Sequence, residues 1–223
     1  MISDTLLPTQ NTRLKRTHER GSFDRETIYQ ILDASPLCHV GYLLNGRPAV
    51  TPTLHWRAGD RIYWHGSSAS RALRRARDAQ VCLTATLMDG YVMARSAYHH
   101  SINFRSVMIY GVAEQVTDKD EKEASLYAMV EAMIPGRWPH LRPINAQEFK
   151  ATTVLSMPVE EASAKIRTGG PVDDEEDYAL PIWAGTVPIL REYGTPVQDP
   201  NSPMDITTPD HITDFANSKP DQV

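Results

Sequence analysis

Alternating apolar and polar residues, broken by short turn sequences, dominate the first third of the chain. Residues 37–44 and 47–56 are rich in apolar and β-branched side chains, and Asn45-Gly46 separates them. Because both residues of this pair tolerate a positive φ, the pattern predicts a tight hairpin between two strands. Residues 58–60 predict a second turn before a third strand over residues 61–64.

Similar strand patterns return later in the chain. Residues 81–87 predict a strand, and Asp89-Gly90 predicts a second two-residue hairpin that leads into residues 91–96. A long strand is predicted over residues 104–116, and shorter strands are predicted over residues 152–157 and 162–167.

Four segments have the spacing and end signals of helices. Residues 23–34 follow Ser22, the predicted cap, and end before Pro36. Residues 118–133 begin with acidic side chains, which suit the positive end of a helix, and stop before Pro135-Gly136. Shorter helices are predicted over residues 67–79 and 145–150.

Consecutive hairpins with few helices indicate a closed antiparallel barrel rather than a parallel sheet. We expect residues 23–194 to form one domain, preceded by a polar N-terminal arm over residues 1–22. Residues 195–223 are rich in Pro, Asp, Asn, Ser and Thr, so they predict a polar C-terminal tail, disordered or draped over the surface.

Charge and cysteine content narrow the classes of function. The 223 residues include 23 Lys and Arg against 28 Asp and Glu, a net charge of -5, which argues against a nucleic-acid partner. Cys38 and Cys82 lie inside apolar runs and form no CxxC pair, so buried structural thiols are expected. The sequence shows neither an apolar signal stretch nor a membrane-length apolar run, so we expect a cytoplasmic location.

The segment His65-Gly66-Ser67-Ser68-Ala69-Ser70-Arg71 lies between a predicted strand and a predicted basic helix. Such a corner brings together backbone N–H groups, serine hydroxyls and a guanidinium, which together suit a phosphate. The alternative is an ordinary helix cap by Ser67, Ser68 or Ser70.

A second polar cluster covers residues 98–106. Arg105 and Ser106 would supply another arm of an anion site, and Asn103 would bind the edge of a heterocycle; the alternative is a surface arginine at a strand entrance. Adjacent histidines point to opposite faces of an extended chain, so His99 and His100 cannot easily hold one metal ion. A metal-dependent enzyme that uses both with His65 remains a rival hypothesis.

Two C-terminal features complete the candidate chemistry. The acidic run over residues 173–177 predicts a solvated loop, or a partner for the basic N-terminal arm of a neighbouring subunit. Trp183 is placed either as an aromatic lid or as ordinary core. The sequence contains neither GxGxxG nor GxxxxGK[ST] nor GxSxG, which disfavours a Rossmann site, a P-loop and a nucleophile elbow.

Taken together, these segments resemble the pyridoxamine 5'-phosphate oxidase-like family of flavin-binding split barrels, in its flavin-nucleotide-binding and nitroimidazole-reductase-like branch. The resemblance runs from about residue 24 to residue 188. It rests on VTPTLHW (50–56), GDRIYWHGS (59–67), SR (70–71), VCLT (81–84), ARS (94–96), HHSINFRSV (99–107), SAKIR (163–167), DDEED (173–177) and PIWAG (181–185).

The resemblance implies a mainly β fold with flanking helices, a six-stranded antiparallel Greek-key split barrel. It also implies a homodimer with two FMN molecules at the subunit interface. His65, Gly66, Ser67, Ser70 and Arg71 would surround the FMN phosphate, with Arg105 and Ser106. Pro52, Thr53 and Leu54 would line the flavin ring, His100, Ser101 and Asn103 would lie near the ring or ribityl chain, and Trp183 would approach from the C-terminal segment.

Two departures from the family pattern limit what carries over. Many relatives have lysine after the Ser-Arg pair, whereas this chain has Ala72, so one phosphate cation is missing unless Arg74 or Arg75 replaces it. The vitamin-phosphate pocket of true pyridoxamine phosphate oxidases has no match here, so that activity is not implied.

The first functional hypothesis is an FMN-dependent oxidoreductase that passes electrons from a reduced nicotinamide to a nitroaromatic, a quinone or oxygen. His100 is the candidate acid–base residue, because imidazole titrates near neutral pH. The alternatives are a non-catalytic FMN carrier or redox sensor, and a split barrel that binds haem or deazaflavin.

Overall fold

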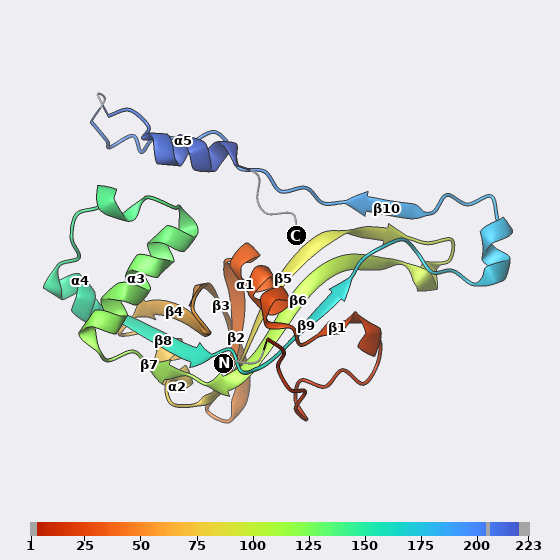
Figure 1. Ribbon diagram of the computed structural model, residues 1–223, viewed down its shortest axis with the longest axis horizontal. Coiled ribbons are helices and arrows are strands. Elements are labelled where there is room, and N and C mark those ends of the chain that lie inside the picture. The colour runs from red at the N-terminus through yellow and green to blue at the C-terminus, as the bar shows by residue number, and fades with distance from the viewer. Residues whose placement is uncertain (1–3, 204–205, 219–223) are drawn as a thin grey trace.

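The computed structural model describes residues 4–203 and 206–218 and is built on one large antiparallel sheet (Figure 1). Its strands follow the order β1-β9-β6-β5-β2-β3-β4-β8-β7, and β10 pairs with β5. In chain order they are β1 Gly21–Ser22, β2 Leu37–Leu44, β3 Arg47–Ala58, β4 Arg61–Ser67, β5 Gln80–Met93, β6 Ser101–Val112, β7 Glu114–Gln115, β8 Thr152–Pro158, β9 Glu161–Arg167 and β10 Gly185–Pro188.

The predicted fold class, mainly antiparallel β with flanking helices, is confirmed, but the sheet is not closed and has ten strands rather than six. The strand path ends at β1 on one side and β7 on the other. The sheet bends sharply within β3. Up to Leu54 this strand pairs with β2, and from His55 it pairs with β4, so it passes from one sheet layer to the other.

The main core lies inside this bent sheet, under α1 (Arg25–Ala34). Ile28, Ile31 and Leu32 of α1 are buried against the sheet. The predicted cap Ser22 is wrong, because Ser22 lies in β1 and the Asp24 carboxylate accepts the Thr27 N–H at 2.8 Å.

The outer face of the second layer is covered by α3 (Lys119–Met133) and α4 (Ala146–Ala151), which are joined through η3 (Trp138–His140). Trp56, Tyr63, Val116, Leu126 and Val154 form a second buried cluster there. Both caps follow their sequence signals. Asp118 caps α3, and Asn145 forms a capping box with Glu148 at the start of α4.

The predicted hairpin at Asp89-Gly90 is wrong, because β5 continues through both residues to Met93. A register shift marks a bulge there, and the Asp89 carboxylate accepts two hydrogen bonds from Arg105, at 3.0 and 2.7 Å. A Cβ at Gly90 would lie 2.8 Å from the Val187 carbonyl oxygen of β10. Asp89 therefore binds β6 through Arg105, and Gly90 leaves room for β10. The chain does not reverse at these two residues.

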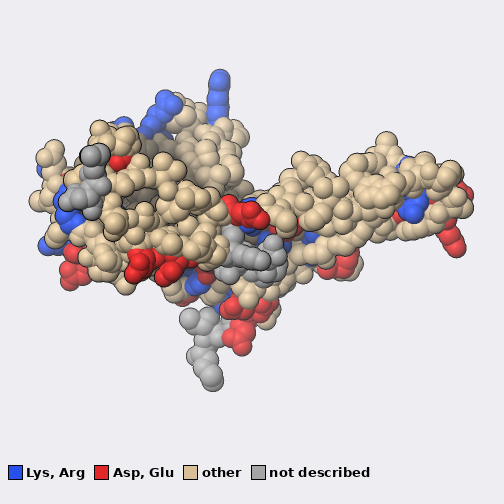
Figure 2. Space-filling view, turned by 90° about the horizontal axis from the view of Figure 1, so that it is seen from above, with Lys and Arg blue, Asp and Glu red and all other residues tan. Residues whose placement is uncertain are grey.

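Beyond this bulge, β5 and β6 leave the barrel as a long arm, which β10 joins along one edge (Figure 1). The chain reverses through η2 (Ala97–His99), and η4 (Glu175–Ala179) lies at the same end. The surface of the arm is mostly uncharged (Figure 2). The acidic run over residues 173–177 begins with the buried Asp173. Its carboxylate accepts hydrogen bonds from the Arg95 N–H and guanidinium of the same chain, both at 3.0 Å.

Both terminal segments are partly ordered on the domain. In the N-terminal arm Leu6 joins the main core, and Thr9 and Asn11 donate hydrogen bonds to Glu161. The tail contains a helix that was not predicted, α5 (Asp210–Asn217), whose His211 ring stacks on His140 at 4.4 Å between ring centroids. The remaining parts of both predicted segments, residues 1–3, 204–205 and 219–223, lie outside the described residues.

The described helices are all too short or too polar to cross a membrane.

Candidate functional site

The segment predicted to hold a phosphate forms one wall of a cavity of about 110 Å³. The cavity lies between β2, β3, β4 and α2 (Arg71–Ala76). Five residues predicted to bind the cofactor are in its wall: Thr53, His65, Gly66, Ser67 and Ser70. The other lining residues are Val40, Tyr42, Thr51, Trp64, Ala72, Leu73 and Ala76.

Local packing explains why this corner forms. A Cβ at Gly66 would lie 3.0 Å from Leu73 Cδ1, so glycine lets α2 pack closely against β4. The Ser70 hydroxyl accepts the Leu73 N–H as the helix cap, and the Ser67 hydroxyl accepts the Ala69 N–H. Both hydroxyls thus serve as acceptors and can still donate their own hydrogen to a ligand.

Backbone groups contribute less to the corner than the sequence indicated. The N–H groups of Ser68, Ala69 and Ser70 already donate to Ala151, Ser67 Oγ and Ser67 O, respectively. Side-chain hydroxyls and guanidinium groups therefore supply most of the donors that an anion would meet here.

Arginines surround the corner on the solvent side. Arg71 and Arg75 are exposed, and neither side chain has a hydrogen-bond or ion-pair partner within the described chain. Arg74 turns back to donate to the Ala69 carbonyl at 2.7 Å, which places its charge beside the corner. Ala72, where many relatives have lysine, lines the cavity instead. Arg74 is thus the one of the two proposed replacements that the structure ties to the corner, whereas Arg75 points to solvent without a described partner.

His65 is held beside Trp56, with 5.6 Å between the ring centroids. Its Nδ1 is buried and has no partner among the described residues. Burial lowers the pKa of His65 below the ordinary histidine value of 6.5. At pH 7 the imidazole is therefore neutral and offers a single N–H to a ligand.

Three predicted residues on β6 are engaged elsewhere. The Arg105 side chain binds Asp89 at the bulge, and the Ser106 hydroxyl donates to the Lys165 carbonyl. Asn103 accepts a hydrogen bond from Arg167 and donates one to the Gly169 carbonyl. The structure does not bring these side chains to the cavity, because each one ties β6 to a neighbouring strand or loop.

His100, Ser101 and Trp183 lie on the arm, away from the cavity of the same chain (Figure 1). His100 is exposed, and its Nδ1 lies 2.8 Å from the Ser96 carbonyl oxygen. Trp183 is 69% exposed and packs on Gly185, where an added Cβ would lie 3.1 Å from the indole. These three side chains therefore lie apart from the residues that line the cavity.

Pro52 and Leu54 lie on the outer face of the sheet formed by β2 and β3. This outer sheet face also carries exposed apolar side chains, including Leu37, Leu43 and Val50, at 54, 63 and 64% exposure. A monomer rarely leaves such a face uncovered.

The bent antiparallel sheet, with α1 over the open side, defines a split barrel. Residues 24–166 match the family model described as pyridoxamine 5'-phosphate oxidase, and the chain belongs to that family. A search of curated proteins found no match.

Two solved structures are similar over most of their length. The flavocytochrome Anf3 from Azotobacter vinelandii is 49% identical, with a TM-score of 0.90 over 94% of this chain and 98% of that chain. The FAD and haem binding protein from Mycobacterium smegmatis is 32% identical, with a TM-score of 0.84 over 87% of this chain and 96% of that chain.

A third structure supports the fold alone. It is described as a putative 5-nitroimidazole antibiotic resistance protein from Bacteroides thetaiotaomicron. It is 23% identical, with a TM-score of 0.54 over 64% of this chain and 84% of that chain.

Proposed function

We propose that this protein is a dimeric redox flavoprotein that binds its flavin phosphate at the corner of Ser67, Ser70 and Arg71. The observation that carries the proposal is the 49% identity to a flavocytochrome over 94% of the chain. The corner supports it with two hydroxyl donors, a neutral imidazole and unpartnered guanidinium groups, which suit a phosphate of about -1.5 to -2 charges.

The flavin ring would lie outside the cavity, because about 110 Å³ is less than the ~300–1,000 Å³ of typical small-molecule sites. Thr53 lines the cavity, and Pro52 and Leu54 continue from it onto the outer sheet face. The ring would rest on this stretch of β3. FMN was the form implied by the family resemblance, and FAD is the form named for the Mycobacterium smegmatis protein. Both contain the phosphate that the corner would hold.

A second copy of the chain would cover the ring. The outer sheet face carries exposed apolar side chains, and the arm projects away from the barrel (Figure 1). In a two-fold dimer the arm would bring His100, Ser101 and Trp183 of one protomer to the flavin of the other. Trp183 would exclude water from the ring, and His100 would hold or move a proton beside it.

Haem is the second group we propose, since the flavocytochrome and the FAD and haem binding protein are each named for a haem as well as a flavin. When bound, a flavin would supply two-electron chemistry with a reduced nicotinamide as donor, and a haem would supply one-electron chemistry toward an acceptor such as a nitroaromatic, a quinone or oxygen. The chain would bind both groups and control access to them.

The test is the visible spectrum of the purified protein and of two arginine variants. Arg71→Ala is expected to weaken flavin binding by about tenfold or more, because a charge-assisted bond contributes ~1.5–3 kcal/mol. Arg16→Ala removes an exposed arginine of the N-terminal segment and serves as the matched control. Chromatography of the released flavin separates FMN from FAD. Equal flavin affinity in Arg71→Ala and Arg16→Ala would show that the corner of Ser67, Ser70 and Arg71 does not bind the flavin phosphate.

A further inference from the structure

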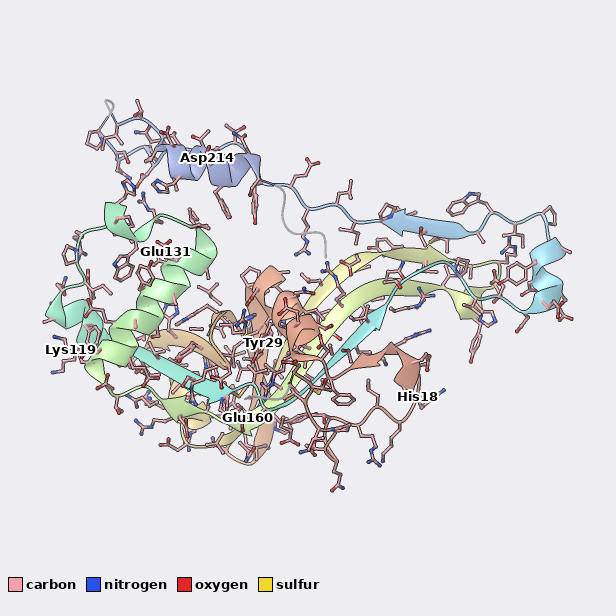
Figure 3. All side chains as sticks on the ribbon, viewed as in Figure 1. His18, Tyr29, Lys119, Glu131, Glu160 and Asp214 are labelled. Carbon is pink, nitrogen blue, oxygen red and sulfur yellow. The ribbon has the colours of Figure 1, made fainter. Side chains whose placement is uncertain are left out.

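A second cavity, of about 280 Å³, lies between α1, β3 and α3. In Figure 3, Tyr29 marks α1 and Glu131 marks α3, on either side of β3. This cavity is separate from the flavin corner, because the two share no lining residue. Its lining residues are Leu32, Asp33, Pro36, Leu54, His55, Trp56, Arg57, Met129, Ala132 and Met133.

The size of this cavity suits a single ring. Its volume lies below the ~300–1,000 Å³ of sites for larger ligands, so it is too small for a flavin or a haem. A cavity of ~150 Å³ is already large enough for benzene. Met129 and Met133 line one wall, and thioether groups make favourable contacts with aromatic rings. One aromatic ring with small substituents therefore fits the space.

The charged pair in the wall selects a neutral ligand. Arg57 Nε donates to the Asp33 carboxylate at 3.0 Å, and Arg57 Nη1 donates to the Gly59 carbonyl at 2.6 Å. The guanidinium is thus already paired, and the Asp33 carboxylate would repel an anion. The Asp33 side chain is 49% exposed, so this pair lies on the solvent side of the cavity.

His55 is the polar group of the wall that the fold leaves incomplete. It is only 3% exposed, and its Nε2 lies 3.1 Å from the Leu32 carbonyl oxygen. That contact requires the hydrogen on Nε2, which leaves a lone pair on Nδ1. Nδ1 is buried and has no partner among the described residues. A buried acceptor without a partner is uncommon, so a donor from a ligand is expected there.

A hydroxyl group on the ring matches this acceptor. Burial lowers the pKa of His55 to about 4, so at pH 7 the imidazole is neutral and keeps its lone pair. A phenol keeps its hydrogen at pH 7, since its ordinary pKa is about 10, whereas a nitro group or a quinone carbonyl has no hydrogen to donate. The hydroxyl oxygen also accepts, which suits the indole N–H of Trp56, a second buried group without a partner among the described residues.

We infer that this cavity binds a small neutral phenol, whose ring lies against the methionines of α3 and whose hydroxyl donates to His55 Nδ1. The inference goes beyond the proposed function and depends neither on the flavin corner nor on haem.

The experiment titrates the purified protein at pH 7 with phenol and with toluene, which has nearly the same shape but no hydroxyl. The methyl NMR signals of Met129 and Met133 report the occupancy of the cavity. A cavity without a polar partner would bind toluene more tightly, because phenol would give up its hydrogen bonds to water. We expect phenol to bind more tightly than toluene by about tenfold or more, because its hydroxyl satisfies the buried acceptor.

The first variant removes the acceptor and keeps the space. His55→Leu is expected to reverse the order, so that toluene becomes the tighter ligand. Retained toluene binding also shows that the variant folds and keeps its cavity. His18→Leu is the matched control and should keep the wild-type order, because the His18 side chain is 86% exposed and lies well away from the cavity (Figure 3).

The second variant removes the space and keeps His55. Ala132→Trp would fill the cavity from α3 and is expected to abolish the binding of both probes. Ala124→Trp, at an exposed position of the same helix outside the cavity lining, should leave both affinities unchanged.

The contrary outcomes are equally distinct. Tighter binding of toluene by the wild type, or an unchanged preference for phenol in His55→Leu, would overturn the hydroxyl contact and with it the inference. Binding of neither probe would show that the cavity holds only solvent and would overturn the site. None of these results bears on the flavin corner, whose own test is the visible spectrum of Arg71→Ala.

Discussion

The barrel and the arm are made from the same two strands, but they bury their side chains very differently. In the barrel, Val81 and Leu83 of β5 and Ile109 of β6 are at most 4% exposed. In the arm, Tyr91 of β5 and Ile102 of β6 are 51 and 38% exposed. The arm is held instead by polar contacts such as the Asp89–Arg105 and Arg95–Asp173 ion pairs.

This contrast shows where the molecule is complete in one chain and where it is not. The barrel has its own hydrophobic core, so its stability comes from within one protomer. The arm buries Val92 and Ala94 on one face and exposes Tyr91 and Ile102, and its buried residues belong to neither of the two core clusters. We therefore expect the arm to gain its burial from a second chain.

The largest effect should come from truncating isoleucine at matched positions of β6. Ile109→Ala is expected to lower the free energy of unfolding by about 2–5 kcal/mol, because it leaves a cavity in the barrel core. Ile102→Ala should cost less than about 1 kcal/mol, and its cost should depend on protein concentration if a partner covers the arm. Urea titrations at two concentrations measure both. Equal losses of unfolding free energy in Ile109→Ala and Ile102→Ala, independent of protein concentration, would contradict the difference between barrel and arm.

The two regions should also differ in their response to acid. His55 has a pKa of about 4 in the fold and about 6.5 when unfolded. The barrel is therefore fully stabilised above pH 6.5 and loses up to about 3 kcal/mol as the pH falls toward 4, because the unfolded chain takes up the proton first. His55→Gln should flatten this dependence.

The Arg95–Asp173 contact of the arm should persist to a lower pH than the stabilisation that neutral His55 gives to the barrel. Burial opposes the charge on Asp173, but hydrogen bonds from Arg95 outweigh this effect and hold the pKa of the carboxyl below its ordinary 3.8. This contact is therefore present above the ordinary aspartate range and is lost only as the pH falls below it. Hydrogen exchange across pH 7 to 4 should show the barrel amides losing protection in the wild type and much less so in His55→Gln. An equal loss in His55→Gln would rule out His55 as the acid-sensitive group.

A smaller effect is expected at the junction between the two regions. Arg105→Ala would leave the half-buried Asp89 carboxylate without its two hydrogen bonds and is expected to cost about 2 kcal/mol. The change should appear as faster exchange in the arm, with the flavin affinity of the barrel corner unchanged. Arg105→Lys, which keeps the charge but not the paired geometry, should recover part of the loss. Weaker flavin binding in Arg105→Ala would instead indicate that Arg105 belongs to the phosphate site, as the sequence predicted.

Local sequence signals predicted the barrel better than the arm. Asn45-Gly46 forms the predicted hairpin, with φ of +53° and +74°. Asp89-Gly90 is the same kind of turn dipeptide but lies in a continuous strand. Arg105 binds the Asp89 carboxylate and β10 packs on Gly90, and both come from distant parts of the chain. A dipeptide carries no information about partners that far away.

The residues of the candidate site also fall into a group that local sequence predicted correctly and a group that it did not. His65 to Arg71 form one local corner, so their proximity could be predicted from consecutive residues. Asn103 and Arg105 had the right chemistry for a ligand, but their partners Arg167 and Asp89 lie on other segments. A second cavity, lined by Leu32 of α1, His55 of β3 and Met129 of α3, was missed for a related reason, because it depends on these three elements meeting in space. Its only sequence signal was a histidine within an apolar strand.

A flavin site shared by two chains is tested most directly by the mass of the purified protein, measured together with its visible absorbance during size-exclusion chromatography with light scattering. We expect one particle of twice the 25.0 kDa chain mass, with flavin and Soret bands that elute with it. A 25.0 kDa particle that carries its full complement of flavin would contradict the shared site, because one barrel would then bind the cofactor without the arm of another.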